Sequence, residues 1–211
     1  AQVAREIGFK LSLISNGSHL TTRVIKELAS QLTCLGISLD SDNSTTNRII
    51  GRTGKNGNQL NRDELIANMA LAREINPQLV LKLNTVVNLH NAGENLSCLV
   101  ERLRPERWKI LRMLPVIDDS LAVSNEEFSA FVQRHRSSES IQCVEDHQDM
   151  CESYLMVDPM GRFFQNQSSL TAGYRYSKPI LSVGTEAAFS EIKFNPTSFR
   201  SRYTGELGGK Q

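Results

Sequence analysis

The chain has 211 residues, of which 39% are hydrophobic and 22% are charged, and its net charge is +1. That length and composition are typical of a globular protein with a real core, and the near-zero charge excludes a global field for nucleic acid or an anionic membrane. Four scattered cysteines exclude a secreted disulfide framework, and no apolar run reaches transmembrane length. These features predict a protein of a reducing, cytoplasmic compartment.

Strands and helices alternate through the first two thirds of the chain. In order, the pattern predicts a strand over residues 9–15, a helix over 19–31, a strand over 34–40, a helix over 61–75, a strand over 79–88, a helix over 94–103, a strand over 107–116 and a helix over 124–136. Capping signals support two of the helices, Asn61 with Glu64 and Ser124 with Glu127. This alternation predicts parallel strands with helical crossovers, so any ligand is expected at the carboxyl ends of the strands.

The two ends of the chain are less regular. Its opening, "AQVAREIGFK", resembles the tail of an amphipathic helix that Gly8 ends, which predicts that the chain is part of a longer protein. Further on, "SYLMVDPMGRFFQN" predicts a hairpin whose turn is "DPMG", and a short helix is predicted over residues 184–192.

Polar side chains occur on one face of four predicted strands, near their carboxyl ends. They are Ser38 and Asp40, Lys82 and Asn84, Arg107 and Lys109, and Tyr154 and Asp158. Because side chains on a strand alternate, each pair shares a face, and a sheet that curls into a barrel would bring these faces together.

Three cations on neighbouring strands predict a bound polyanion. Burial of an unpaired charge is costly, and a polyphosphate would neutralise Lys82, Arg107 and Lys109 together. The glycine-bearing loop "IIGRTGKNG" adds Arg52 and Lys55, although it lacks the order of a P-loop.

Simpler interpretations stay open for each of these groups. Lysines near strand ends often extend to water, Ser38 and Asp40 fit ordinary turn positions, and Tyr154 fits a core aromatic. Asn16 and Gly17 fit a turn. A separate alternative is a metal site, because "CVEDHQDMC" spaces Cys143, His147 and Cys151 by four residues, as on one face of a helix.

Six segments in this order resemble the viperin-like family of radical S-adenosylmethionine enzymes, the 3′-deoxy-3′,4′-didehydronucleotide synthases. They are "ISNGS", "GISLDS", "IIGRTGKNGN", "LKLNTVVN", "PERWKILRML" and "SYLMVD", and the resemblance runs from about residue 7 to about residue 205. It implies a partial (βα)₆ barrel, here strands three to six plus a C-terminal extension. The barrel part would be residues 1–136, and residues 137–211 would close the substrate site.

The resemblance also implies a reaction. A [4Fe–4S] cluster would cleave S-adenosylmethionine, and the 5′-deoxyadenosyl radical would take hydrogen from C4′ of a ribonucleoside triphosphate. Loss of the 3′-hydroxyl as water would give an antiviral chain terminator. The implied partners are CTP, UTP or GTP and a reductant such as flavodoxin or ferredoxin, with no direct nucleic acid. Eukaryotic relatives dock on the endoplasmic reticulum.

Site residues follow from the same resemblance. The resemblance places S-adenosylmethionine beside Asn16, Ser38 and Arg52. It assigns the triphosphate to a clamp of Lys82, Arg107 and Lys109, and a further substrate contact to Asn84. It assigns the role of catalytic hydrogen or proton donor to Tyr154. The family's Cys-x₃-Cys-x₂-Cys motif is not in this sequence, so the cluster ligands are expected upstream and no metal ligand in this chain. Two alternatives stay open: an inactive nucleotide-binding or interaction module, and a radical enzyme for another phosphorylated substrate.

Overall fold

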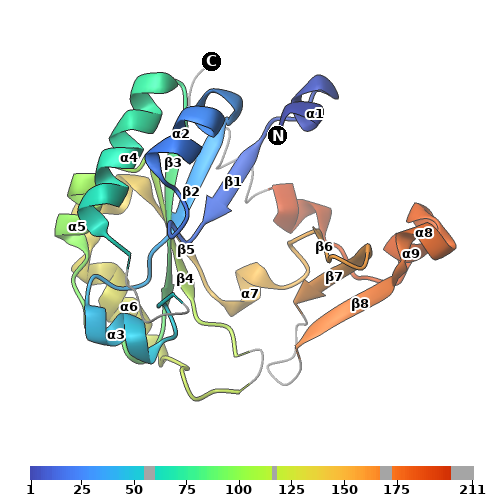
Figure 1. Cartoon of the computed structure of the whole chain (residues 1–211). Coiled ribbons are helices and arrows are strands. Elements are labelled where there is room, and N and C mark those ends of the chain that lie inside the picture. Colours follow the sequence, from blue (N-terminus) through green and yellow to red (C-terminus); the bar gives the residue numbers. More distant parts are fainter. Residues whose placement is uncertain (55–59, 116–117, 167–172, 201–211) are drawn as a thin grey trace. The chain divides into compact units, whose positions relative to one another are not determined.

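The computed structural model describes residues 1–54, 60–115, 118–166 and 173–200. The chain divides into two compact units, Ala1–Arg112 with Val123–Val144, and Met113–Ala122 with Glu145–Gln211 (Figure 1). The functional boundary predicted at residue 136 stays a prediction. Among the described residues, no helix is both long and apolar enough to cross a membrane.

A five-stranded sheet forms the centre of the first unit. Its order is β1 (Ser12–Ser15), β2 (Cys34–Ser38), β3 (Val80–Val87), β4 (Arg107–Arg112) and β5 (Gln142–Glu145). The pairs from β1 to β4 are parallel, which confirms the predicted fold class. Strand β5 was not predicted, because its four residues, "QCVE", are too few to show a periodic pattern.

Helices connect the strands and cover one side of this sheet (Figure 1). They are α2 (Thr22–Leu28), α3 (Ser44–Ile49), α4 (Arg62–Ile75), α5 (Ser97–Leu103) and α6 (Asn125–Arg134), with 3₁₀ turns at Ala29–Gln31 and Arg136–Ile141. A further short helix, α1 (Gln2–Glu6), precedes β1 and has no buried residue. The predicted caps are confirmed: Asn61 accepts the Glu64 N–H, and Ser124 and Glu127 form a capping box.

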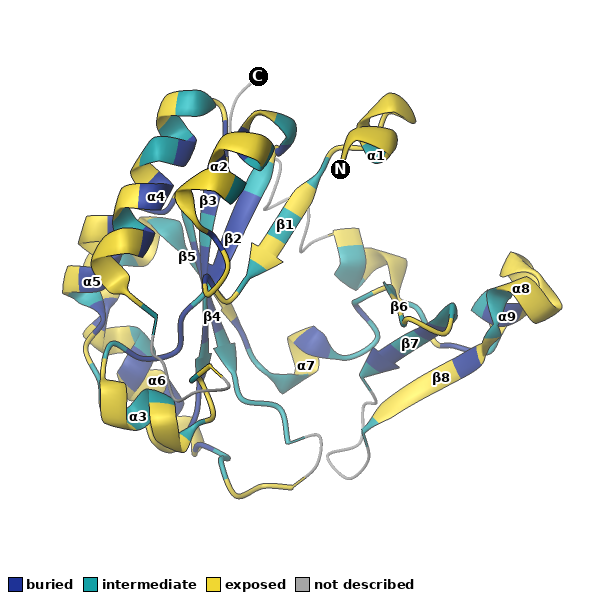
Figure 2. Ribbon diagram, in the orientation of Figure 1, coloured by how far each residue is buried: buried dark blue, intermediate teal, exposed yellow. Residues whose placement is uncertain are grey.

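The two faces of the sheet differ in polarity. On β3, Leu81, Leu83, Thr85 and Val87 are buried, whereas the alternate residues are partly exposed (Figure 2). The buried set packs with α2, α4, α5 and α6 in one hydrophobic core, where Trp108 donates from its indole nitrogen to Thr85. The partly exposed set, which starts with Lys82, therefore faces away from this core.

The second unit contains a separate antiparallel sheet. Strands β6 (Met156–Val157), β7 (Arg162–Asn166) and β8 (Tyr174–Pro179) pair in this order, beside α7 (His147–Met150), α8 (Ile180–Val183) and α9 (Thr185–Ser190). A small core of Phe163, Ala188 and Ile192 holds α9 against the sheet. The predicted hairpin at "DPMG" is confirmed as the β6–β7 turn.

Candidate functional site

A pocket of about 750 Å³ opens in the first unit at the carboxyl ends of β1 and β2. Asn16, Ser38 and Arg52, which the resemblance assigns to S-adenosylmethionine, all line it. These residues follow β1, end β2 and follow α3, so three separate segments meet there, where ligands of parallel α/β proteins bind. Apolar side chains, among them Leu60 and Leu65, share the lining.

Asn16 builds the turn that follows β1. Its amide oxygen accepts hydrogen bonds from the backbone N–H of Ser18 at 3.1 Å and from the Ser18 hydroxyl at 2.8 Å. Gly17 has φ of +84°, and a Cβ there would lie 3.3 Å from methyl groups of Leu60 and Leu65. The turn interpretation of Asn16 is thus confirmed, and its role toward a cofactor stays a prediction.

Arg52 is placed by the way helix α3 ends. Asn43 caps the start of α3, and after its last turn Gly51 has φ of +74°. The Gly51 N–H bonds to the Arg48 carbonyl at 3.3 Å and the Arg52 N–H to the Asn47 carbonyl at 2.7 Å, the paired bonds of a Schellman motif. This reversal turns Arg52 back toward the end of β2.

The guanidinium of Arg52 meets Asp40 at that point. Its Nε lies 2.5 Å from Oδ2 of Asp40, which is only 4% exposed. The other oxygen, Oδ1, accepts the backbone N–H of Val86 on β3 at 2.8 Å. Asp40 was predicted as a polar strand-end residue; its partnership with Arg52 was not predicted.

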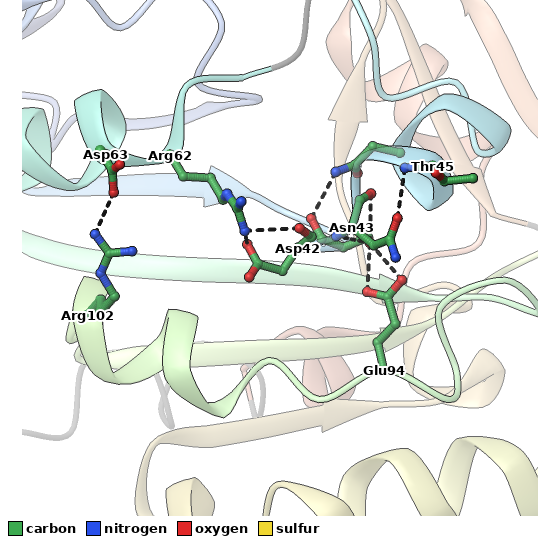
Figure 3. A network of polar contacts seen from close by, with 9 residues as sticks. Asp42, Asn43, Thr45, Arg62, Asp63, Glu94 and Arg102 are labelled. Carbon is green, nitrogen blue, oxygen red and sulfur yellow. Dashed lines mark hydrogen bonds and ion pairs between the residues drawn. The ribbon is translucent and has the colours of Figure 1, made fainter.

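A network of polar contacts holds the loop that follows Asp40, around Asp42 and Asn43 (Figure 3). The Ser41 hydroxyl lies 2.8 and 2.6 Å from the two oxygens of Glu94, and Asn91 donates to the Asp40 carbonyl at 2.7 Å. Asp42, in the same loop, forms an ion pair with Arg62 at the start of α4. Sequence reasoning missed Asn91 and Glu94; the polar run "NLHNAGEN" after β3 was the available signal.

Farther from the pocket, Arg102 on α5 and Asp63 on α4 form an exposed ion pair at 2.6 Å (Figure 3). The hydrogen bond from Arg102, together with its charge, lowers the pKa of the Asp63 carboxyl below its ordinary value. Because both side chains are at least half exposed, solvent screens this pair. It does not line the pocket.

The cations of the predicted clamp do share one face of the sheet. Lys82 on β3 is the register partner of Arg107 on β4, and Asn84 is the partner of both Lys109 on β4 and Ser38 on β2. Lys109 is 9% exposed, whereas the other members of this set are partly exposed. Three strands therefore carry one polar row on the side opposite the helices, adjacent to Ser38 of the pocket. Lys55 lies outside the described residues.

The prediction that a fourth strand, with Tyr154 and Asp158, belongs to this face was wrong. "SYLMVD" does not join the parallel sheet: only Met156 and Val157 form a strand, and they pair antiparallel with β7 in the second unit. Asp158 closes the turn to β7, where its carboxylate accepts the N–H groups of Met160 and Arg162 and pairs with the Arg162 guanidinium at 2.7 Å. These bonds lower the pKa of Asp158.

Tyr154 precedes β6 in the second unit. Its hydroxyl donates to Oε2 of Glu145 at 3.1 Å, and its carbonyl accepts from the Gln165 amide at 3.0 Å. Glu145 is 4% exposed, so Tyr154 satisfies a buried carboxylate. Its catalytic role stays a prediction.

The metal interpretation of "CVEDHQDMC" was wrong. Cys143 lies on strand β5, and helix α7 begins only at His147, so the three side chains do not share a helix face. His147 instead contacts the Met113 carbonyl through Nε2 at 2.8 Å, and the Cys151 thiol donates to the His147 carbonyl. In the described part of the chain, no group of three or more His, Cys, Asp or Glu side chains is placed to hold a metal ion.

Known proteins resemble the chain over most of its length. No family model matches. The chain is 43% identical, over 95% of its length, to an S-adenosylmethionine-dependent nucleotide dehydratase from Psychrobacter lutiphocae, of which it covers 66%. It is 36% identical, over 94% of its length, to a protein of the same name from Flammeovirga pacifica, of which it covers 68%. The chain belongs to the S-adenosylmethionine-dependent nucleotide dehydratase family.

That membership confirms the resemblance drawn from the sequence motifs. The chain spans about two thirds of the length of these curated dehydratases. Among solved structures, a domain of pyruvate-formate lyase-activating enzyme from Bacteroides vulgatus matches 67% of this chain and 84% of its own length, with a TM-score of 0.50 and 16% identity. This likeness supports the predicted partial-barrel fold.

Proposed function

We propose that the protein containing this chain is a radical S-adenosylmethionine enzyme that converts a ribonucleoside triphosphate to its 3′-deoxy-3′,4′-didehydro analogue. The reaction would remove hydrogen from C4′ and lose the 3′-hydroxyl as water, and a reductant such as flavodoxin or ferredoxin would supply electrons. The names of the related dehydratases support the cofactor and the nucleotide class. The triphosphate, the cytoplasmic location and the antiviral product are parts of the proposal.

One observation carries the choice of a triphosphate: Lys82, Arg107 and Lys109 lie on one face of adjacent strands, in register with Asn84 and Ser38. Several positive charges gathered on one face attract an anion that carries several negative charges. A chain of phosphates spans neighbouring strands and offers an oxygen to each cation. Asn84 and Ser38, next along this face, would then contact the sugar end of the substrate and the cofactor.

The neighbouring pocket fits S-adenosylmethionine by its chemistry. A carboxylate is held well by a guanidinium and a hydroxyl, which Arg52 and Ser38 supply, and Leu60 and Leu65 give the apolar contact that an adenosyl group needs. The described residues do not fit a [4Fe–4S] cluster, since none of them form a three-cysteine set. The proposal therefore assigns cluster binding to no residue of this chain.

Anaerobic iron–sulfur reconstitution of the full-length protein tests the proposal. Formation of 5′-deoxyadenosine is measured with CTP, UTP and GTP in turn, and the nucleotide products are weighed by mass spectrometry. We expect one nucleotide to stimulate 5′-deoxyadenosine strongly and to give a product lighter by one water. A protein that binds the triphosphate but assembles no cluster would instead be a nucleotide-binding module.

A further inference from the structure

Asp40 is the buried acid of the pocket, and both of its carboxylate oxygens are engaged. Oδ2 lies 2.5 Å from Nε of Arg52, and Oδ1 accepts the Val86 N–H at 2.8 Å. The residue is only 4% exposed. A buried carboxylate without its partner is costly, so the pair with Arg52 is the arrangement that burial favours.

The contact through Nε determines which part of Arg52 remains for a ligand. Arginine carries one inner nitrogen, Nε, and two terminal NH₂ groups that form a planar fork. Asp40 occupies the inner nitrogen, while the Arg52 side chain is 39% exposed and lines the pocket. No other described residue accepts a hydrogen bond from this guanidinium. The fork is therefore free to bind a planar anion in two parallel hydrogen bonds.

Asp40 itself is held in place by β3 and by the loop that follows it. Asn91 is fully buried, and its amide donates to the Asp40 carbonyl at 2.7 Å and to the Val86 carbonyl at 2.9 Å. The Val86 N–H holds the carboxylate from the same strand. Strand β3, which also carries Lys82 and Asn84, thus fixes the direction of Arg52.

We propose that Asp40 is a positioning residue, which orients Arg52 so that its two terminal NH₂ groups grip the carboxylate of the amino-acid part of S-adenosylmethionine. This inference rests on the proposed function, because it takes S-adenosylmethionine as the occupant of the pocket. Asp40 touches no ligand in this scheme and acts only through Arg52. Its effect is therefore confined to ligands that carry the carboxylate.

Two probes separate this role from a general structural one. S-adenosylhomocysteine has the amino-acid carboxylate, whereas 5′-methylthioadenosine shares the adenosine and the thioether but has no carboxylate. Calorimetry on the full-length holo-protein gives the Kd of each. For Asp40→Asn we expect the Kd of S-adenosylhomocysteine to rise about tenfold or more, the cost of one charge-assisted contact. The Kd of 5′-methylthioadenosine should stay within about twofold.

Asp63→Asn is the matched control. It makes the same chemical change in another aspartate–arginine pair of the first unit, but Asp63 does not line the pocket. Both Kd values should remain at those of the wild type. A second test is the double variant: once Arg52→Gln has removed the fork, adding Asp40→Asn should not weaken S-adenosylhomocysteine further, because the two residues act in series.

If Asp40→Asn fails to fold, Arg52→Lys answers the same question at a more exposed position. Lysine keeps the charge but has no fork, so the preference for S-adenosylhomocysteine should fall as for Asp40→Asn. The inference would be overturned if a variant lost affinity equally for S-adenosylhomocysteine and 5′-methylthioadenosine. It would also be overturned if Asp40→Asn or Arg52→Lys kept the wild-type preference for S-adenosylhomocysteine. Either result would leave the proposed function standing. A wild-type protein without any preference for the carboxylate-bearing probe would overturn both.

Discussion

Lys82 and Arg107 lie directly opposite one another on the parallel strands β3 and β4, and Lys109 follows two residues later on β4, opposite Asn84. The three side chains place three positive charges on one face of two adjacent strands. The face that they share is the one that the helices leave uncovered. Because each phosphate of a polyanion can contact a different cation of this set, the affinity should depend on the number of phosphates.

The first prediction concerns this clamp. Lys82→Ala and Lys109→Ala should each weaken binding of a nucleoside triphosphate about tenfold or more, since each loses a charge-assisted hydrogen bond worth about 1.5–3 kcal/mol. The loss should be smaller for the monophosphate, which reaches fewer cations. Calorimetric titration with both nucleotides measures it, and Lys26→Ala on the exposed face of α2 is the control. Unchanged triphosphate affinity in both variants would contradict the proposal that Lys82 and Lys109 bind the triphosphate.

The alternation along β3 was enough to predict that Lys82 and Asn84 share a face, because the period of a strand is local. The register that places them beside Arg107, Lys109 and Ser38 was not predictable, since parallel strands are joined through long crossovers and their pairing depends on tertiary packing. "SYLMVD" has a strand-like composition, yet hydrogen bonds to β7 place it in the second unit.

The environment of Arg52 shows the same limit at the pocket. The order "NRIIGR", with glycine directly after a short helix, is a local signal for the Schellman motif that the structure contains. The pairing of Arg52 with Asp40 joins residues that a helix separates, and burial of Asp40 depends on Val86 and Asn91 from later in the chain. Only the folded sheet brings these groups together.

The second prediction tests the glycine that directs Arg52. Gly51→Ala places a side chain at φ of +74°, which costs about 1–2 kcal/mol for a residue other than glycine. The turn after α3 should shift, and the affinity for S-adenosylhomocysteine should fall more than that for 5′-methylthioadenosine.

Gly161→Ala is the control for this prediction. Gly161 has φ of +71° in the β6–β7 turn, and like Gly51 it has open space at its Cβ, so the substitution carries equal backbone strain. Gly51→Asn should largely restore binding, because asparagine tolerates this conformation. Equal effects of Gly51→Ala and Gly161→Ala would contradict the role of the motif.

The third prediction concerns Tyr154. Tyr154→Phe removes only the hydroxyl that donates to Glu145, so nucleotide affinity should be retained, while the yield of dehydrated nucleotide per 5′-deoxyadenosine should fall. Mass spectrometry of products from single-turnover reactions gives this ratio. Tyr174→Phe removes an exposed hydroxyl of the same unit and should leave the ratio unchanged. Wild-type turnover in Tyr154→Phe would exclude Tyr154 from the mechanism.

The fourth prediction is a pH dependence of stability that arises from His135. This imidazole is fully buried between Trp108 and Phe131, accepts the Leu96 N–H at Nε2 and contacts the Phe131 carbonyl through Nδ1. Both contacts, at 2.8 Å, fit the neutral tautomer that carries its proton on Nδ1. Burial lowers the pKa of His135 below its ordinary value.

The sign follows from proton binding. Below the ordinary histidine pKa the unfolded chain binds a proton that the folded chain does not, so the free energy of unfolding falls as pH drops from about 6.5 toward the lowered folded pKa. The slope from this one group is at most about 1.4 kcal/mol per pH unit. Urea denaturation of the wild type between neutral and mildly acidic pH measures it. His135→Gln should be less stable at neutral pH but should lack this part of the slope, whereas His19→Gln, an exposed position, should keep it. A slope that survives in His135→Gln would assign the pH dependence to other groups.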